Sequence, residues 1–186
     1  GMSPRPDQIE RGKKLNIIWS CAPRYIEDAM DISRDYGEKY AHEMNAPIQT
    51  ILRAGGKVVG EMDDGRLHRK EGGVFAHIKY AVTRKDSQGR TWGPQQAVDK
   101  QTALKMFTRW AAEYVLRENT LGSLEPGKCA DFAVIDRDYL NIPDEDLSKV
   151  NVLMTAVAGK AAYTDADFAK AEVLQAVSFK LRSRVQ

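Results

Sequence analysis

Short apolar runs alternate with helical segments through the first half of the chain, and this order limits the fold more than any other property of the sequence. One apolar run covers Leu15–Trp19 and ends before Pro23, and a second covers Lys57–Gly60. Runs of this length with β-branched residues are typical of buried strands. A helical segment follows each run. The order strand, helix, strand, helix therefore predicts βα units and a parallel sheet.

Four segments of this half carry helical patterns or capping residues. Asn45 is a candidate N-cap, Gly55-Gly56 is a typical helix end, and Asp99 is a second candidate N-cap. Apolar residues recur at helical spacing within the segments. The expected helical segments are residues 24–44 (broken at Gly37), 46–54, 72–84 and 100–118.

The residue pattern changes after Gly122, where short strand-like runs replace the long helical patterns. Strands are expected over Phe132–Ile135, Val150–Val157 and Ala158–Tyr163, with a turn at Gly159-Lys160. The segment 166–184 again has apolar residues at helical spacing. Residues 1–14 are polar with two prolines, and we expect them to form a loose lead-in.

The composition argues against several classes of partner. The chain has 186 residues, with 28 Lys plus Arg, 26 Asp plus Glu, and a net charge of +2, so no basic surface for nucleic acid is expected. No apolar run approaches the ~18 residues of a membrane helix, and no signal peptide is visible. Cys21 and Cys129 have neither a disulfide framework nor a CxxC zinc spacing. We expect a cytoplasmic protein with no nucleic-acid and no membrane partner.

The segment from Ala103 to Pro143 resembles the C-terminal signature of the amidohydrolase superfamily, in particular amidohydrolase family 3. The shared pattern is an Ala-Leu helix with a Thr, a Gly-Ser-Leu-x-x-Gly-Lys-x-Ala-Asp turn, and a strand ending in Asp. The Ala-Val-Thr-Arg at 81–84 and the Gly-Lys-x-x-Tyr at 159–163 fit the same family, so the resemblance covers residues 15–163. The matching positions are Ala103, Leu104, Thr108, Ala111, Gly122, Ser123, Leu124, Gly127, Lys128, Ala130, Asp131 and Asp136.

This resemblance implies an α/β fold, namely a (β/α)8 TIM-type barrel with a small composite β-sandwich built from both chain termini. A barrel needs ~250 residues, so this chain has room for only the last two βα units. Leu15–Trp19 would be the seventh barrel strand and Lys57–Gly60 the eighth. The expected organisation is a partial barrel over 1–118, part of the composite sandwich over 119–165, and a C-terminal helix over 166–186.

The family resemblance also implies a metal site at the carboxyl ends of the barrel strands. Its ligands are a His-x-His pair, a Lys or Glu, two further histidines, and an Asp on the eighth strand that takes the proton of a metal-bound water. This chain has no His-x-His. Asp63 falls on the eighth-strand position and is the candidate catalytic residue and metal ligand, with Asp64 as a one-residue alternative. By composition alone, EMDDG (61–65) is more often a solvated acidic loop.

Other reactive side chains carry weaker signals. His42, His68 and His77 have no metal-binding spacing and are expected to be ordinary surface histidines. Cys21 lacks a partner pattern for a nucleophile and is expected to be buried at a strand end. The resemblance implies structural roles for Lys128 and Asp131.

The resemblance implies hydrolysis of non-peptide carbon–nitrogen bonds in small amide or cyclic amide substrates. A divalent metal, zinc, is expected in the full-length enzyme. None is expected on this chain, since catalytic zinc usually needs three protein ligands, and the chain alone is expected to be inactive. The alternative is a non-catalytic binding or oligomerisation module derived from an amidohydrolase. Open strand edges favour a homo-oligomer; the substrate is left open.

Overall fold

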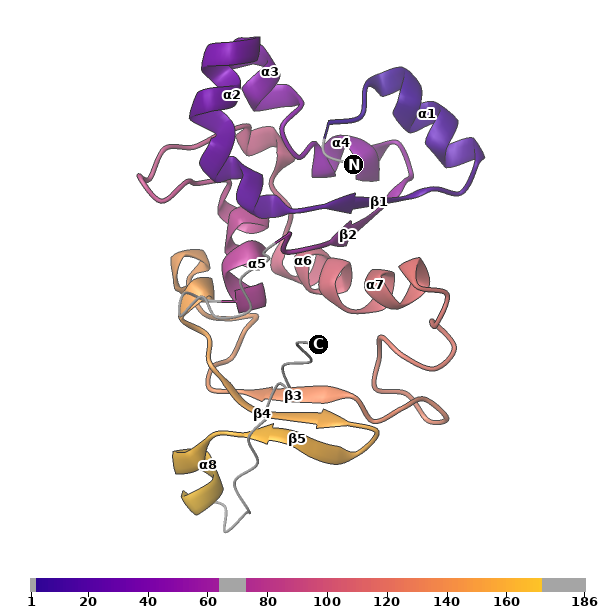
Figure 1. Cartoon of the computed structure of the whole chain (residues 1–186), viewed down its shortest axis with the longest axis vertical. Coiled ribbons are helices and arrows are strands. Elements are labelled where there is room, and N and C mark those ends of the chain that lie inside the picture. The colour runs from indigo at the N-terminus through magenta and orange to yellow at the C-terminus, as the bar shows by residue number, and fades with distance from the viewer. Residues whose placement is uncertain (1–2, 64–72, 172–186) are drawn as a thin grey trace, which may run out of the picture.

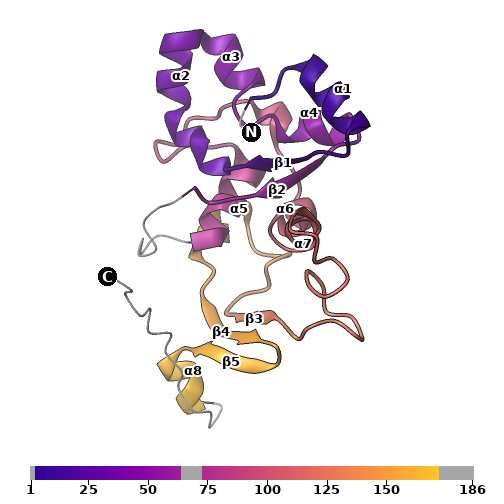
Figure 2. The same cartoon turned by 45° about the vertical axis from the view of Figure 1, so that its right-hand side comes forward.

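The computed structural model describes residues 3–63 and 73–171. Figures 1 and 2 show a pair of strands with one group of helices above it, a second group below it, and a separate small sheet at the far end. The upper elements are α1 (Pro6–Lys14), β1 (Ile18–Cys21), η1 (Pro23–Asp28), α2 (Ala29–Tyr36), α3 (Glu38–Glu43), α4 (Ile48–Arg53) and β2 (Lys57–Gly60). The elements after β2 are α5 (Gly73–Thr83), η2 (Pro94–Gln96), α6 (Lys100–Phe107), α7 (Arg109–Tyr114), β3 (Phe132–Ile135), η3 (Asp144–Lys149), β4 (Val152–Val157), β5 (Lys160–Thr164) and α8 (Ala166–Ala171). Of these, η2 lies beside α4 in the upper group, where Gln96 bonds Thr50.

Strands β1 and β2 pair in parallel, with Ile18 opposite Lys57 and Cys21 opposite Gly60. The chain crosses from one to the other through η1 and α2–α4, so the predicted βα unit is confirmed. Strand β1 begins three residues later and ends two residues later than the predicted strand Leu15–Trp19. The amide of Ile17 donates to the carbonyl of Gly12 (2.9 Å) and Asn16 adopts a φ of 55°, so the end of α1 holds Leu15 outside the sheet.

The expected loose lead-in is wrong, because residues 6–14 form helix α1. Pro6 stands at the first helical position, where its fixed φ suits the helix and its missing N–H is not needed. The Arg5 amide donates to the side-chain oxygen of Gln8 (2.9 Å), which closes the first turn. Ile9 is buried and ties the helix to the core.

Two helix predictions need correction. Asn45 is not an N-cap, because α4 begins at Ile48 after Pro47; its side chain is buried and bonds elsewhere. The expected helix over 100–118 is split at Thr108 into α6 and α7. The Thr108 hydroxyl donates to the carbonyl of Leu104 (2.7 Å), a bond that bends helices. Asp99 caps α6 as predicted, accepting from the amide of Thr102 (2.7 Å).

The small sheet is antiparallel, in the order β3–β4–β5. The strand over Phe132–Ile135 matches its predicted bounds, whereas β4 and β5 each begin two residues later than expected. The hairpin is tied to the preceding turn, since the Ala158 amide donates to the carboxylate of Asp131 (2.7 Å). Of the expected C-terminal helix, the structure describes α8; residues 172–186 lie outside the described part.

The main core lies between α4, β2, α5 and α6. Its fully buried side chains include Ile51, Val58, Ile78 and Met106. At Gly60, where β2 meets α6, an added Cβ would lie 2.4 Å from the ring of Phe107, so a larger residue there would force this ring to move. This core fixes the end of β2, where the candidate site begins.

Candidate functional site

Asp63 lies three residues beyond the end of β2, on the edge of the sheet where the parallel strand β1 also ends. The pairing continues past the strands, since the amide of Glu61 donates to the carbonyl of Cys21 (2.9 Å). Asp63 adopts a φ of 43°, a left-handed conformation that Asp tolerates better than most residues. Its position at a carboxyl end of parallel strands is where α/β enzymes place catalytic groups. Asp64 is outside the described residues.

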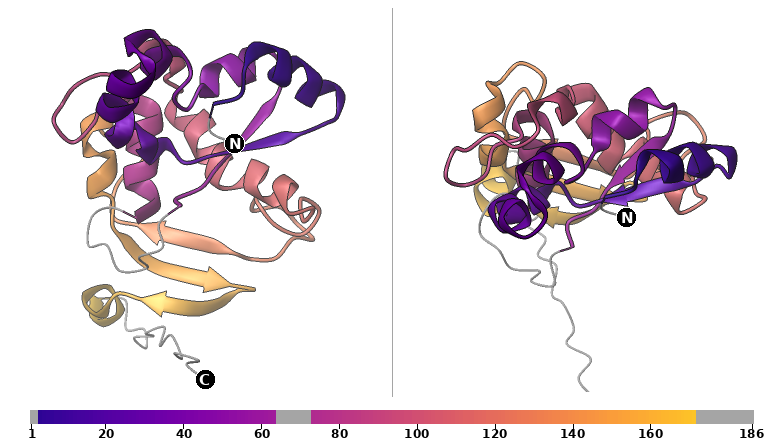
Figure 3. Two further views of the ribbon diagram at one scale, coloured as in Figure 1. Left: turned by 45° about the horizontal axis from the view of Figure 1, so that its top comes forward. Right: turned by 90° about the horizontal axis from the view of Figure 1, so that it is seen from above.

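The side chain of Tyr25 reaches Asp63 from the segment that follows β1. Its hydroxyl donates a hydrogen bond to Oδ2 of the Asp63 carboxylate. This hydrogen bond, with a contribution from burial, raises the pKa of Tyr25, because the phenolate would lose the bond and face a negative charge. The hydrogen bond between Tyr25 and Asp63 therefore links the segments that follow β1 and β2. Figure 3 shows the two strands seen from other directions.

Cys21, at the end of β1, is buried as the sequence predicts. Burial raises the pKa of its thiol to about 12, so the reactive thiolate is scarce at neutral pH. Cys21 therefore acts as an apolar core residue beside the site and not as a nucleophile.

Two histidines are described, and neither lies in a cluster of metal ligands. The amide of Gly93 donates to Nδ1 of His42 (2.9 Å), whose ring centroid lies 5.2 Å from that of Trp92. His77 is buried on α5, so its prediction as a surface residue is wrong; its ring lies edge-on to Tyr80. His68 is outside the described residues.

Within residues 3–63 and 73–171, no group of three or more His, Cys, Asp or Glu side chains could hold a metal ion. Asp63 supplies one carboxylate, whereas a catalytic zinc site usually has three protein ligands. The described residues therefore do not fit a complete metal site. No helix in this part of the chain has the length and apolar character needed to cross a membrane.

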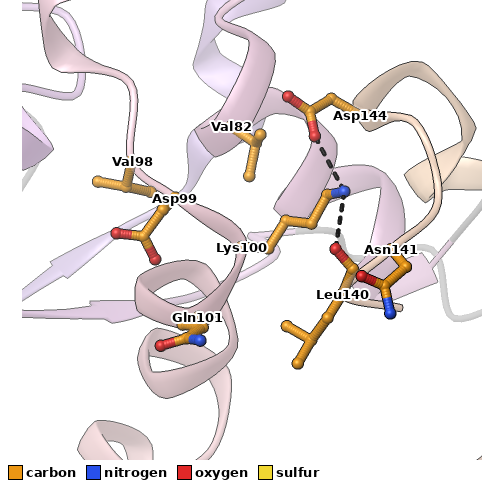
Figure 4. Close-up of a pocket in the computed structure, with 8 residues that line it drawn as sticks. All are labelled: Val82, Val98, Asp99, Lys100, Gln101, Leu140, Asn141 and Asp144. Atoms are coloured by element: carbon orange, nitrogen blue, oxygen red, sulfur yellow. Dashed lines mark hydrogen bonds and ion pairs between the residues drawn. The ribbon is translucent and has the colours of Figure 1, made fainter. Parts of the chain in front are cut away.

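A polar pocket at the start of α6 has a structural role (Figure 4). The Nζ atom of Lys100 lies 3.1 Å from the Asp144 carboxylate and donates to the carbonyls of Leu140 and Ile142. An ammonium group has three donors, and these three partners use them all. Lys100 therefore links α6 to the segment leading to η3, and its ammonium group has no donor left for a ligand.

An apolar groove of about 770 Å³ lies between helices α5–α7 and strand β3, and we call it the β3 groove. Consecutive strand residues point to opposite faces of a sheet, yet Phe132 and Ala133 both line it. The groove therefore runs along the edge of β3. Its apolar lining comes mainly from Phe75, Leu104, Phe107, Ala111, Val115, Leu121, Leu124, Phe132, Ile135 and Tyr139.

Lys128 and Asp131 have structural roles, as the family resemblance implies. The Lys128 ammonium donates to the hydroxyl of Ser123 (2.7 Å), and Asp131 accepts from the hairpin amide of Ala158 (2.7 Å). Sequence reasoning missed Tyr25, which falls within the segment 24–44 that was expected to be helical. Its place four residues after a strand of a parallel sheet is the signal that could have identified it.

Comparison with protein families gives a match to the model of the amidohydrolase family over residues 1–163. The chain is 33% identical over 128 residues to an N-substituted formamide deformylase from Arthrobacter pascens, covering 68% of this chain and 23% of that protein. It is 30% identical over 172 residues to a 5-methylthioadenosine/S-adenosylhomocysteine deaminase from Bacillus cereus, covering 86% of this chain and 35% of that protein. The chain thus spans about a quarter to a third of these relatives.

Solved structures give the same result. An uncharacterized metal-dependent hydrolase from Pyrococcus furiosus is 28% identical with a TM-score of 0.62, over 75% of this chain and 28% of that one. One from Pyrococcus horikoshii is 24% identical with a TM-score of 0.65, over 77% and 29%. Atrazine chlorohydrolase TrzN from Arthrobacter aurescens, complexed with zinc, shares the fold at 21% identity and a TM-score of 0.56, over 92% and 38%. The family match over most of its length shows that this chain belongs to the amidohydrolase family.

Proposed function

We propose that this chain is the C-terminal part of a metal-dependent hydrolase, with Asp63 as its catalytic carboxylate and one of its metal ligands. The observation that carries the proposal is the parallel β1–β2 pair, which ends with Asp63 at its carboxyl edge. In this proposal β1 and β2 are the seventh and eighth strands of a (β/α)8 barrel over residues 1–118. Residues 119–165 belong to the composite sandwich and 166–186 to a C-terminal helix.

The β3 groove supports the proposed composite sandwich. It runs along the edge of β3 and is lined by apolar side chains, so its natural occupant is an extended segment that pairs with that edge. The curated relatives are three to four times longer than the matched part. We assign the groove to a strand from the remainder of such a longer chain.

The proposed reaction is hydrolysis of a carbon–nitrogen bond other than a peptide bond, in an amide or cyclic amide. The names of the two curated relatives, a deformylase and a deaminase, support this bond type. The role of Asp63 is to accept a proton from the attacking water, as a general base. A metal, zinc by analogy with the atrazine chlorohydrolase complex, needs ligands beyond the described residues. The chain alone is proposed to be inactive.

We propose the cytoplasm as the compartment, because Cys21 and Cys129 are both free thiols. The proposed partner is a small-molecule amide.

The test of this proposal is a longer product of the same reading frame, extended upstream of the codon for Met2. We expect a His-x-His motif in the extension, and turnover of a panel of N-formyl amines, N-acyl amines and cyclic amides by the metal-loaded protein. Asp63→Asn should lower kcat by at least ~100-fold, the usual contribution of a general base. Full activity of the Asn variant, or a frame without His-x-His, would overturn the proposal.

The second candidate is a non-catalytic binding or oligomerisation module, which the exposed side chains of the β3 groove favour. In that case a second copy of the chain would cover the groove, giving a homo-oligomer. Size-exclusion chromatography with light scattering distinguishes the two candidates. A stable dimer that Leu124→Glu dissociates favours the module, and a monomer counts against it.

A further inference from the structure

Asp63 is an exposed residue at the end of a strand, and its side chain can rotate unless something holds it. A general base must lie within hydrogen-bond reach of the proton that it accepts. Catalytic side chains are therefore held by neighbours that are themselves fixed. In this structure the neighbour is Tyr25, whose hydroxyl donates to Oδ2 of Asp63.

Both backbone polar groups of Tyr25, its amide and its carbonyl, are hydrogen-bonded. Its amide donates to the carbonyl of Ala22 (3.1 Å), and its carbonyl accepts from Nδ2 of Asn45 (2.9 Å). Asn45 is buried, so the donor of this bond is largely shielded from water. The backbone of Tyr25 is therefore fixed from β1 on one side and from the segment before α4 on the other.

Asn45 is anchored in turn by Arg84, which lies at the end of α5 and is fully buried. The guanidinium donates to the carbonyls of Asn45 (2.8 Å), Ala46 (3.2 Å) and Trp92 (2.9 Å). Burial lowers the pKa of Arg84 to about 10, which leaves it charged at neutral pH. A buried cation that bonds three carbonyls from two separate loops is a rigid anchor.

We infer that Tyr25 is a positioning residue for Asp63, anchored by Asn45 and the buried Arg84. The series runs from Arg84 through Asn45 and Tyr25 to Asp63, and each link is a hydrogen bond. The Tyr25 hydroxyl engages Oδ2 and turns the carboxylate so that Oδ1 accepts the proton. The inference rests on the role of Asp63 in the proposed function.

The direct test uses the 186-residue chain with 13C-labelled aspartate carboxyl groups, observed by NMR. Asp63→Asn identifies the Asp63 signal by its disappearance. Tyr25→Phe, which removes only the hydroxyl, should displace this signal and leave the other aspartate signals in place. Asn45→Ala should displace it less. The matched control is Tyr36→Phe at an exposed tyrosine, which should leave the Asp63 signal unchanged. An Asp63 signal that does not move in Tyr25→Phe overturns the inference.

A second arm uses the longer, metal-loaded product. Tyr25→Phe should lower kcat by about 10- to 100-fold with KM nearly unchanged, since a misplaced catalytic group loses rate on this scale. If Asp63→Asn keeps full activity, the proposed function fails, while the NMR result still decides whether Tyr25 holds Asp63. If Asp63→Asn is inactive and Tyr25→Phe is fully active, the positioning role alone fails.

Discussion

The unit around β1 and β2 and the small sheet β3–β5 differ in how completely they bury their apolar side chains. Val58 and Ile51 in the first unit are buried, whereas Leu124 beside the small sheet is 70% exposed. The first unit closes its own core with α4, α5 and α6. The small sheet instead leaves the β3 groove open along one edge. One region therefore contains the main core, and the other leaves apolar side chains exposed along the edge of β3.

The largest effect should come from the anchor of the first unit. Replacing Arg84 with Met leaves three carbonyls without a donor, and the free energy of unfolding should fall by about 3–5 kcal/mol. Urea denaturation measures this change. The control is Arg34→Met, at a side chain that is 68% exposed, with an expected change within ~0.5 kcal/mol. Equal effects at the two sites would show that the buried arginine is not an anchor.

The contact between β2 and α6 should be nearly as sensitive. Gly60→Ala places a methyl group 2.4 Å from the ring of Phe107 and should cost about 1–3 kcal/mol of unfolding free energy. Adding Phe107→Leu should recover part of this loss, because a smaller side chain makes room. An alanine variant as stable as the parent would contradict the close packing of the first unit.

Two leucines compare the two environments: Leu147, on η3, packs into the main core, and Leu124 lines the β3 groove. Leu147 is 0% exposed, so Leu147→Ala should cost about 2–5 kcal/mol. Leu124 lines the β3 groove in an exposed position, so Leu124→Ala should cost less than ~0.5 kcal/mol. Chemical denaturation of both variants gives the two values. A large loss at Leu124 would mean that the groove is covered in solution, and the comparison of the two regions would then break down.

A smaller effect than that of the buried leucine should come from Asp86, whose carboxylate bonds the indole of Trp92. Burial would raise the pKa of Asp86, but hydrogen bonds from Trp92 and Arg90 outweigh it and hold the pKa below the ordinary 3.8. Because the folded pKa is lowered, the carboxylate stabilises the fold fully above 3.8, and this is lost as the pH falls through the folded pKa. Asp86→Asn should cost about 1 kcal/mol near neutral pH.

The pH dependence separates this carboxylate from others in the chain. Unfolding free energies measured between about pH 7 and pH 3 should fall less steeply in Asp86→Asn than in the parent. An equal slope in the two proteins would show that Asp86 does not contribute to the acid sensitivity.

The sequence predicts the parallel pair and the small sheet well, because both follow local apolar runs. The bounds of Lys57–Gly60 and Phe132–Ile135 match the strands in the structure. The failures occur where a backbone change or a side-chain hydrogen bond overrides the local pattern. Thr108 reads as an ordinary helical residue, but its backbone leaves the helical region (φ −129°, ψ −87°) and separates α6 from α7. Asn45 reads as an N-cap, but its side chain bonds the carbonyl of Tyr25, 20 residues away.

Of the two residues of the candidate site, one could be predicted from the sequence. Asp63 follows from its position after a strand and from the family pattern, whereas Tyr25 depends on how β1 and β2 pair and on where η1 turns. Tyr25 and Asp63 are 38 residues apart in sequence, so no local pattern joins them. The anchoring role of Arg84 has the same origin, because its carbonyl partners lie in two distant loops.

We propose that Asp63 is one ligand of a metal site that other parts of a longer chain complete. Calorimetric titration of zinc into the 186-residue chain tests it most directly, with Asp63→Asn as the comparison. We expect no tight one-to-one zinc site on the 186-residue chain, and such a site in the longer product. One equivalent of zinc bound tightly to the 186-residue chain, and lost in Asp63→Asn, would contradict it.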